Sequence, residues 1–155
     1  MTSQAIHAQT PIILQPQDGH FIDELNVRVL ASESTTGGAM MACTCINPGP
    51  GGPALHTHHA HDEYYLVLRG HYRFQIGDRQ IDGGPGTFVS APRDTIHTFA
   101  SIGPEEGEVF TIALPGGLER FLERMAKLPV RGSVRDGLPE LFSDFASEIN
   151  GPPLV

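Results

Sequence analysis

Basic side chains and long apolar runs are both scarce in this sequence. Ten lysines and arginines stand against 18 aspartates and glutamates, which gives a formal net charge of −8 with the histidines neutral. Such an acidic balance argues against a nucleic-acid partner and against an anionic membrane surface. No apolar run approaches the roughly 20 residues needed to cross a bilayer. The opening "MTSQAIHAQTPIILQ" has no basic stretch followed by an apolar one, so we expect no secretory signal and a cytoplasmic location.

Cysteine is also scarce, with only Cys43 and Cys45, in "MMACTCINP". On an extended segment their side chains point to the same face, and neighbouring same-face positions of one strand are a poor geometry for a disulfide. The spacing is not C-x-x-C, so a thioredoxin-like motif is excluded. We interpret the pair as small apolar side chains of a core, with a pocket lining as the alternative.

Glycine and proline, by contrast, are abundant, with 18 and 13 among 155 residues. They separate short segments of strand-like alternation with no helical pattern between them, which favours a sandwich, jelly roll or barrel. The chain length suits a single domain. The expected strands are residues 12–14, 26–32, 39–47, 63–69, 71–76, 86–91, 96–102 and 108–114.

The pattern becomes helical after residue 115. In "GGLERFLERMAKLP" apolar residues recur at spacings of three and four, charged residues fill the other face, and Pro129 ends the segment. A second amphipathic helix is expected over residues 138–149, "LPELFSDFASEI". Both apolar faces are expected to dock on the strands, with partner binding as the alternative.

The stretch "HTHHAHDE", residues 56–63, carries the chemistry. His56 and His58 are one residue apart, so both imidazoles face the same way on an extended segment. A bend before Glu63 would aim that carboxylate back at the same point. A fourth ligand should come from elsewhere, and "PRDTIHTF" offers His97.

These residues resemble the two motifs of the cupin superfamily. The first motif consists of H-x-H, then four residues, a glutamate, six residues and a glycine. His56, His58, Glu63 and Gly70 match it. The second motif consists of a glycine, five residues, a proline and a histidine five positions after the proline. Positions 86, 92 and 97 match it, and 15 residues separate the two motifs.

The resemblance covers about residues 25–115, and the tail is similar to single-domain cupins often labelled quercetin-dioxygenase-like. It implies an all-β fold, a cupin double-stranded β-helix or jelly-roll barrel, with two C-terminal α-helices at about residues 116–150. The whole chain, residues 1–155, would be one cupin domain.

Three turn positions depart from the motifs: Pro50 and Asp94 stand where glycine is usual, and Ser101 replaces the terminal asparagine. These departures concern loop geometry, whereas all four ligand positions are intact. The neighbouring His59 and His61 form a second H-x-H pair, but no glutamate follows them at the right distance. We interpret them as turn residues or as groups that support the ligands.

Three imidazoles and one carboxylate suit one divalent transition metal ion, whether Fe, Mn, Co, Ni, Cu or Zn. Four protein ligands leave two positions of an octahedral shell for a bidentate ligand, or for one substrate oxygen and O₂. A closed structural zinc site is the alternative, and a metal-free member is another.

Alternation predicts which side chains line the pocket beside the ion. Tyr65 and Val67 follow Glu63 inward, Phe99 follows His97, and Tyr72 and Phe74 form the apolar face of their strand. For residues 39–47 both faces are apolar, so either Cys43 and Cys45 or the set Met40, Ala42 and Thr44 completes the floor. Such a pocket favours an aromatic or apolar small molecule over a sugar phosphate.

The expected function is a metal-dependent dioxygenase that acts on a small aromatic molecule bearing an enol, similar to quercetinases. The resemblance assigns Glu63 a catalytic role, in which it takes the substrate proton. The alternatives are an O₂-independent isomerase, decarboxylase or lyase, and a binding protein without turnover. The resemblance also implies a homodimer formed through N-terminal strands.

Overall fold

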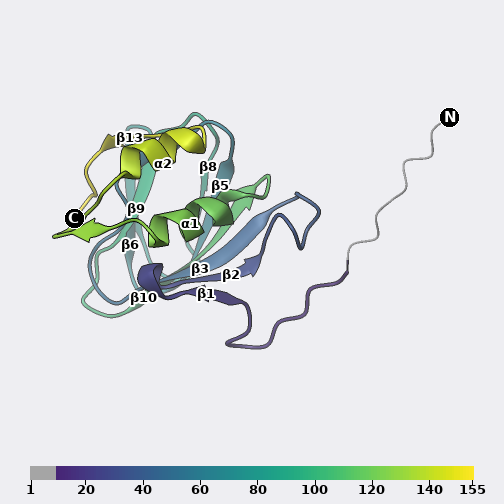
Figure 1. Ribbon diagram of the computed structural model, residues 1–155. Helices are drawn as coiled ribbons and strands as arrows, with labels where there is room; N and C mark the ends of the chain where they lie inside the picture. Colours follow the sequence, from purple (N-terminus) through teal and green to yellow (C-terminus); the bar gives the residue numbers. More distant parts are fainter. Residues whose placement is uncertain (1–9) are drawn as a thin grey trace.

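Two antiparallel sheets form a jelly-roll barrel in the computed structural model, which describes residues 10–155 (Figure 1). Residues 1–9, expected to belong to the same domain, lie outside the described part. In spatial order, the first sheet contains β1 (His20–Ile22), β2 (Val27–Ala31), β3 (Met41–Asn47), β10 (Gly107–Leu114), β5 (Asp62–Arg69) and β8 (Phe88–Ala91). The second sheet contains β13 (Ser147–Gly151), β4 (Leu55–His58), β9 (His97–Ser101), β6 (Tyr72–Ile76) and β7 (Arg79–Gly83).

The remaining elements are short and mostly C-terminal. They are the 3-10 helix η1 (Asp23–Leu25), the helices α1 (Leu118–Ala126) and α2 (Leu138–Asp144), and the hairpin strands β11 (Val130–Arg131) and β12 (Val134–Arg135). The predicted all-β jelly roll with two C-terminal helices is confirmed. No helix within the described residues is long and apolar enough to span a bilayer. The cytoplasmic location stays a prediction.

Period-two alternation places the core between the sheets. Along β5 the buried positions are Glu63, Tyr65 and Val67, and along β10 every second residue is buried. Aromatic side chains from the two sheets meet inside the barrel, where the rings of Tyr65 and Phe74 lie 5.8 Å apart. The sheets therefore pack face to face, with side chains filling one end of the barrel.

The helices close the other end of the barrel against β1, β2 and β3. Leu118 and Phe121 of α1 and Phe142 of α2 are buried in a cluster with Met41 and Cys43 of β3. Figure 1 shows both helices lying across the same side of the strands. The apolar faces predicted for the helices are thus docking faces.

One glycine shows how the turns constrain the sequence. Gly70 joins β5 to β6 with a φ of +81°, in the left-handed region that favours glycine. A Cβ atom there would lie 2.7 Å from the Cα of Gly107. The glycine expected from the first motif is required by both constraints.

One expected strand is absent, and one expected helix ends earlier than predicted. Residues 12–14 form no strand, because that segment lacks a neighbouring strand and its apolar side chains are exposed. The second helix ends at Asp144 rather than at residue 149, since the chain turns at Ala146 and enters β13. The backbone groups of β13 are hydrogen-bonded to β4 instead of to a longer helix.

Candidate metal centre and its cavity

Three strands converge to bring four ligating side chains together. His56 and His58 come from β4, Glu63 from β5 and His97 from β9, and His56 lies directly opposite His97 in the antiparallel ladder. All four are buried, and one ligand atom from each lies within 4.8 Å of the others. The structure thus brings together the four residues that the sequence singled out.

The distances to the carboxylate show how tightly this set is gathered. Oε2 of Glu63 lies 2.8 Å from Nε2 of His97, 3.3 Å from Nε2 of His58 and 4.0 Å from Nε2 of His56. Ligands about 2.1 Å from one ion would be separated by about 3 to 4 Å. These donor atoms therefore fit a single divalent cation.

The second ring nitrogen, Nδ1, of each ligand histidine makes a hydrogen bond outside the cluster. Nδ1 of His56 donates to the carbonyl of Ala54 (2.7 Å), and Nδ1 of His97 donates to the carbonyl of Thr95 (2.8 Å). Because a carbonyl only accepts, these bonds place the ring proton on Nδ1 and turn Nε2 toward the centre. Such bonds orient the histidine ligands of metal sites.

His58 has a different anchor, Ser147 of β13. The Ser147 hydroxyl donates to the Phe145 carbonyl (3.0 Å), so it accepts from Nδ1 of His58 (2.7 Å). The C-terminal strand thereby fixes one ligand of the centre. Sequence reasoning missed Ser147, because it assigned residue 147 to a helix.

Electrostatics within the cluster set its protonation. Burial and the neighbouring imidazoles of His97 and His58 lower the pKa of His56 to about 3, so this ring is neutral at neutral pH. Burial opposes the charge on Glu63, but His58 and His97 outweigh it and hold the pKa of that carboxyl well below its usual range. Burial likewise lowers the pKa of His97, yet its hydrogen bond to Glu63 leaves that pKa raised. Nε2 of His97 and Oε2 of Glu63, 2.8 Å apart, are close enough to form an ion pair when the imidazole is protonated.

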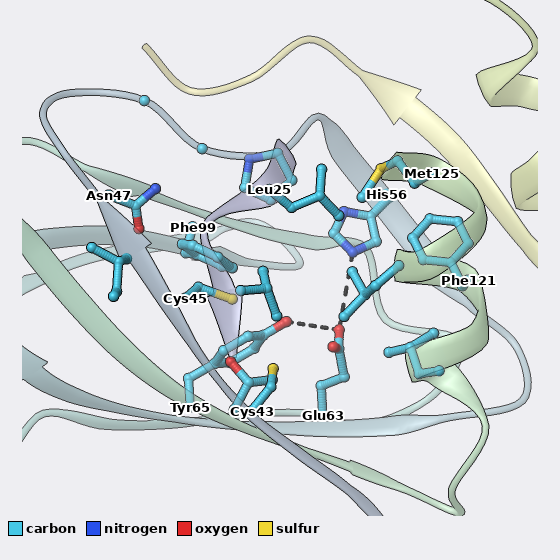
Figure 2. A pocket seen from close by; sticks show the side chains of 18 of the residues that line it. Leu25, Cys43, Cys45, Asn47, His56, Glu63, Tyr65, Phe99, Phe121 and Met125 are labelled. Atoms are coloured by element: carbon cyan, nitrogen blue, oxygen red, sulfur yellow. Dashed lines mark hydrogen bonds and ion pairs between the residues drawn. The ribbon is translucent and has the colours of Figure 1, made fainter. Parts of the chain in front are cut away.

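Tyr65 also contacts the ligand carboxylate. Its hydroxyl donates to Oε2 of Glu63 (2.7 Å), as Figure 2 shows. Burial, reinforced by the charge of Glu63, raises the pKa of Tyr65 well above its usual value, so the phenol keeps its proton. One carboxylate oxygen is therefore held by a neutral donor.

An ion pair connects the two sequence motifs. Asp62, just before Glu63, accepts two hydrogen bonds from the Arg93 guanidinium (3.0 and 2.9 Å) and one from its backbone N–H (2.8 Å). Those contacts lower the pKa of Asp62 to about 2. Asp94, where the motif usually has glycine, adopts a φ of +66°, which aspartate tolerates. The turn that delivers His97 is thus anchored to β5.

The extra histidines lie outside the cluster of four. His59 is exposed and bonds Asp94 through Nδ1 (2.6 Å). His61 is buried, and its ring centre lies 6.3 Å from that of His58. Its Nδ1 makes no hydrogen bond with any of residues 10–155. Burial and the nearby His58 lower the pKa of His61.

The cluster opens into a cavity of about 420 Å³ bounded by the first sheet, the loop after β3 and both helices (Figure 2). Tyr65 and Phe99 line it, as do Met41, Cys43 and Cys45, which settles the face of β3. Among its described lining residues, none is lysine or arginine. The walls are chiefly apolar, and Glu63 is the one carboxylate among the lining residues that the structure describes.

Three of the residues expected in the pocket do not line this cavity. Val67, Tyr72 and Phe74 lie in the aromatic cluster that fills the far end of the barrel, and each is at most 1% exposed. Alternation predicts that a side chain points into the barrel, but not which end of the barrel is filled by the protein's own side chains. We therefore correct the expectation for these three residues.

The chain is similar in sequence to proteins of a known family. Residues 43–113 match the family described as Cupin domain. Quercetin 2,3-dioxygenase from Bacillus subtilis (strain 168) is 24% identical over an alignment of 129 residues that covers 80% of this chain. The chain spans only 37% of the length of that relative.

Solved structures share the fold at low identity. KdgF from Halomonas sp. superposes with a TM-score of 0.58 at 18% identity, covering 72% of this chain and 97% of that one. TT1209 from Thermus thermophilus superposes with a TM-score of 0.56 at 14% identity, covering 68% of this chain and 98% of that one. At these identities the likeness concerns the architecture alone.

Proposed function

From the premise that this chain is a cupin superfamily protein with a candidate site for one metal ion, we propose that it is a metal-dependent dioxygenase acting on a small aromatic molecule that bears an enol. The observation that carries the proposal is the opening of a buried three-histidine, one-glutamate cluster into a chiefly apolar cavity. The sequence similarity to quercetin 2,3-dioxygenase, which extends over about a third of that relative's length, supports the proposal.

The chain supplies the binding site and a proton acceptor. When bound, a divalent ion would act as a Lewis acid that lowers the pKa of a coordinated enol. Phe99 of the second sheet and Phe121 of α1 face the cavity from different elements and are placed to hold an aromatic ring (Figure 2). Apolar side chains of α1 and α2 line one side of the cavity.

Glu63 is the proposed base. Its carboxylate is ionised at neutral pH and lies within the ligand cluster, where a substrate hydroxyl would approach. Tyr65 holds Oε2, and the second oxygen, Oε1, is therefore the one that would take the proton. Glu63 would thus hold the ion together with the three histidines and also supply the proton acceptor.

The test is oxygen uptake with quercetin as the probe. The purified protein is stripped of metal, refilled separately with Fe, Mn, Co, Ni, Cu or Zn, and assayed in an oxygen electrode. We expect uptake with a redox-active ion and its loss in His97→Ala. Turnover of quercetin under argon would instead select an O₂-independent enzyme, and binding without product would select a binding protein.

We also propose that two copies of the chain associate as a homodimer. Ile12, Ile13 and Leu14 are 43%, 82% and 40% exposed, and the segment before β1 extends away from the sheets (Figure 1). Isolated apolar side chains are common on surfaces, but three in succession favour burial against another chain. Light scattering should give the mass of a dimer for the native chain and of a monomer for Ile13→Asp.

A further inference from the structure

A buried hydroxyl in the cavity wall has no hydrogen-bond partner in the part of the chain that the structure describes. Thr111 of β10 is 4% exposed and lines the cavity, yet its Oγ1 makes no hydrogen bond with any described residue. The great majority of buried polar side-chain atoms in folded proteins are hydrogen-bonded, because an unpaired one loses its contacts with water and gains nothing in return. A free hydroxyl on a residue that lines a ligand cavity therefore points to a contact with the ligand.

The strand register fixes where this hydroxyl lies. Thr111 is opposite Cys43 of β3 and Tyr65 of β5, while Ala113, two residues further along β10, is opposite Met41 and Glu63. Two residues of a strand span about 7 Å, and side chains two apart share a face. Thr111 thus lies one row away from the row that contains the ligand carboxylate, on the same inner face of the sheet.

Two other polar atoms of this wall already have hydrogen-bond partners. The Tyr65 hydroxyl donates to Glu63 (2.7 Å), and Oδ1 of Asn47 accepts from the Tyr72 hydroxyl (2.9 Å). Cys43, the neighbour of Thr111 in the same row, offers only a thiol, which is a weak hydrogen-bonding group. The Thr111 hydroxyl is thus a buried polar group without a hydrogen-bond partner among residues 10–155, one row away from Glu63.

We propose that Thr111 is a specificity-determining residue, whose hydroxyl bonds a second oxygen of the ligand, distinct from the oxygen held by the metal centre. The proposal rests on the proposed function and narrows its substrate class. The ligand is a mainly apolar, uncharged molecule with an enol oxygen at one site and a hydroxyl or carbonyl oxygen on its body. The absence of lysine and arginine among the described lining residues disfavours a carboxylate in that second position.

Binding of matched flavonols tests the contact. The native protein, Thr111→Val and Thr111→Ser are loaded with Zn²⁺, which is redox-inert, and titrated with 3-hydroxyflavone, 3,7-dihydroxyflavone and 3,4′-dihydroxyflavone. We expect one dihydroxy probe to bind the native protein about tenfold more tightly than 3-hydroxyflavone, as one satisfied hydrogen bond would give. Thr111→Ser should keep that preference and Thr111→Val should lose it. A preference unchanged in Thr111→Val would overturn the proposal.

Thermal unfolding without any probe supplies an independent readout. Thr111→Val should raise Tm by about 2–4 °C, because a methyl group replaces an unpaired hydroxyl. The control Thr98→Val should lower Tm, since the Thr98 hydroxyl donates to the Pro53 carbonyl (2.8 Å). A fall in Tm for Thr111→Val would show that the hydroxyl already has a partner, and the inference would be wrong. If no flavonol binds the native protein, the proposed function fails in its ligand class, while Tm still decides whether the Thr111 hydroxyl is free.

Discussion

Replacing Ser147 by alanine should weaken metal binding from a position outside the ligand set. The hydroxyl of Ser147 is the acceptor for Nδ1 of His58, and both residues are at least 95% buried. Without it, the Nδ1 proton has no acceptor while Nε2 is held at an ion. An unpaired buried donor costs about 1–3 kcal/mol, which corresponds to a loss of about 5- to 150-fold in affinity. Loss of such a supporting contact to a metal-bound histidine usually costs about 10- to 100-fold, so the two ranges agree.

The assay is a Zn²⁺ competition titration against a chromogenic chelator. Ser143→Ala is the matched control, because Ser143 lies four residues earlier in α2 and is exposed. We expect an affinity at least about tenfold weaker for Ser147→Ala and unchanged for Ser143→Ala, with both variants folded by circular dichroism. If Ser147→Ala bound Zn²⁺ within twofold of the native protein, β13 would not position His58 as argued.

Two further outcomes follow from the protonation and packing of the same region. A cation must displace the proton that His97 shares with Glu63, so affinity should fall as pH decreases, by about one logarithmic unit per pH unit. Since the pKa of His97 is raised above 6.5, the fall should begin above pH 6.5, and calorimetric titrations in several buffers should detect release of one proton; a pH-independent affinity would refute this ion pair. Phe74→Ala should lower the free energy of unfolding by about 3–5 kcal/mol in urea denaturation, because Phe74 is fully buried among aromatic rings. A loss below 1 kcal/mol would instead place Phe74 in a loosely packed pocket.

The sequence predicts the fold and the ligand set well, because both leave local signals. Alternation with turn residues indicates the strands, and the spacing of His56, His58 and Glu63 places three ligands near one point. His97 is recognisable from the second motif. All four meet in the structure.

What the sequence could not predict depends on contacts between distant segments. Nothing within "FASEI" distinguishes a continuing helix from a strand, since the decisive partner of Ser147 is His58, 89 residues away. Periodicity likewise directs Tyr72 and Phe74 inward without saying which end of the barrel is packed. Whether the Thr111 hydroxyl has a partner depends on its neighbours in β3 and β5, which lie far from it in the sequence.

The most direct test of the central claim is the metal stoichiometry of the purified protein after reconstitution, compared among the native chain, His97→Ala and His61→Ala. One ion per chain is expected for the native protein. His97→Ala should lose it, and His61→Ala, whose ring is buried beside His58 but lies outside the cluster of four, should retain it. A native protein that binds no divalent ion, or an equal loss in His61→Ala, would contradict the assignment of His56, His58, Glu63 and His97 as the metal centre.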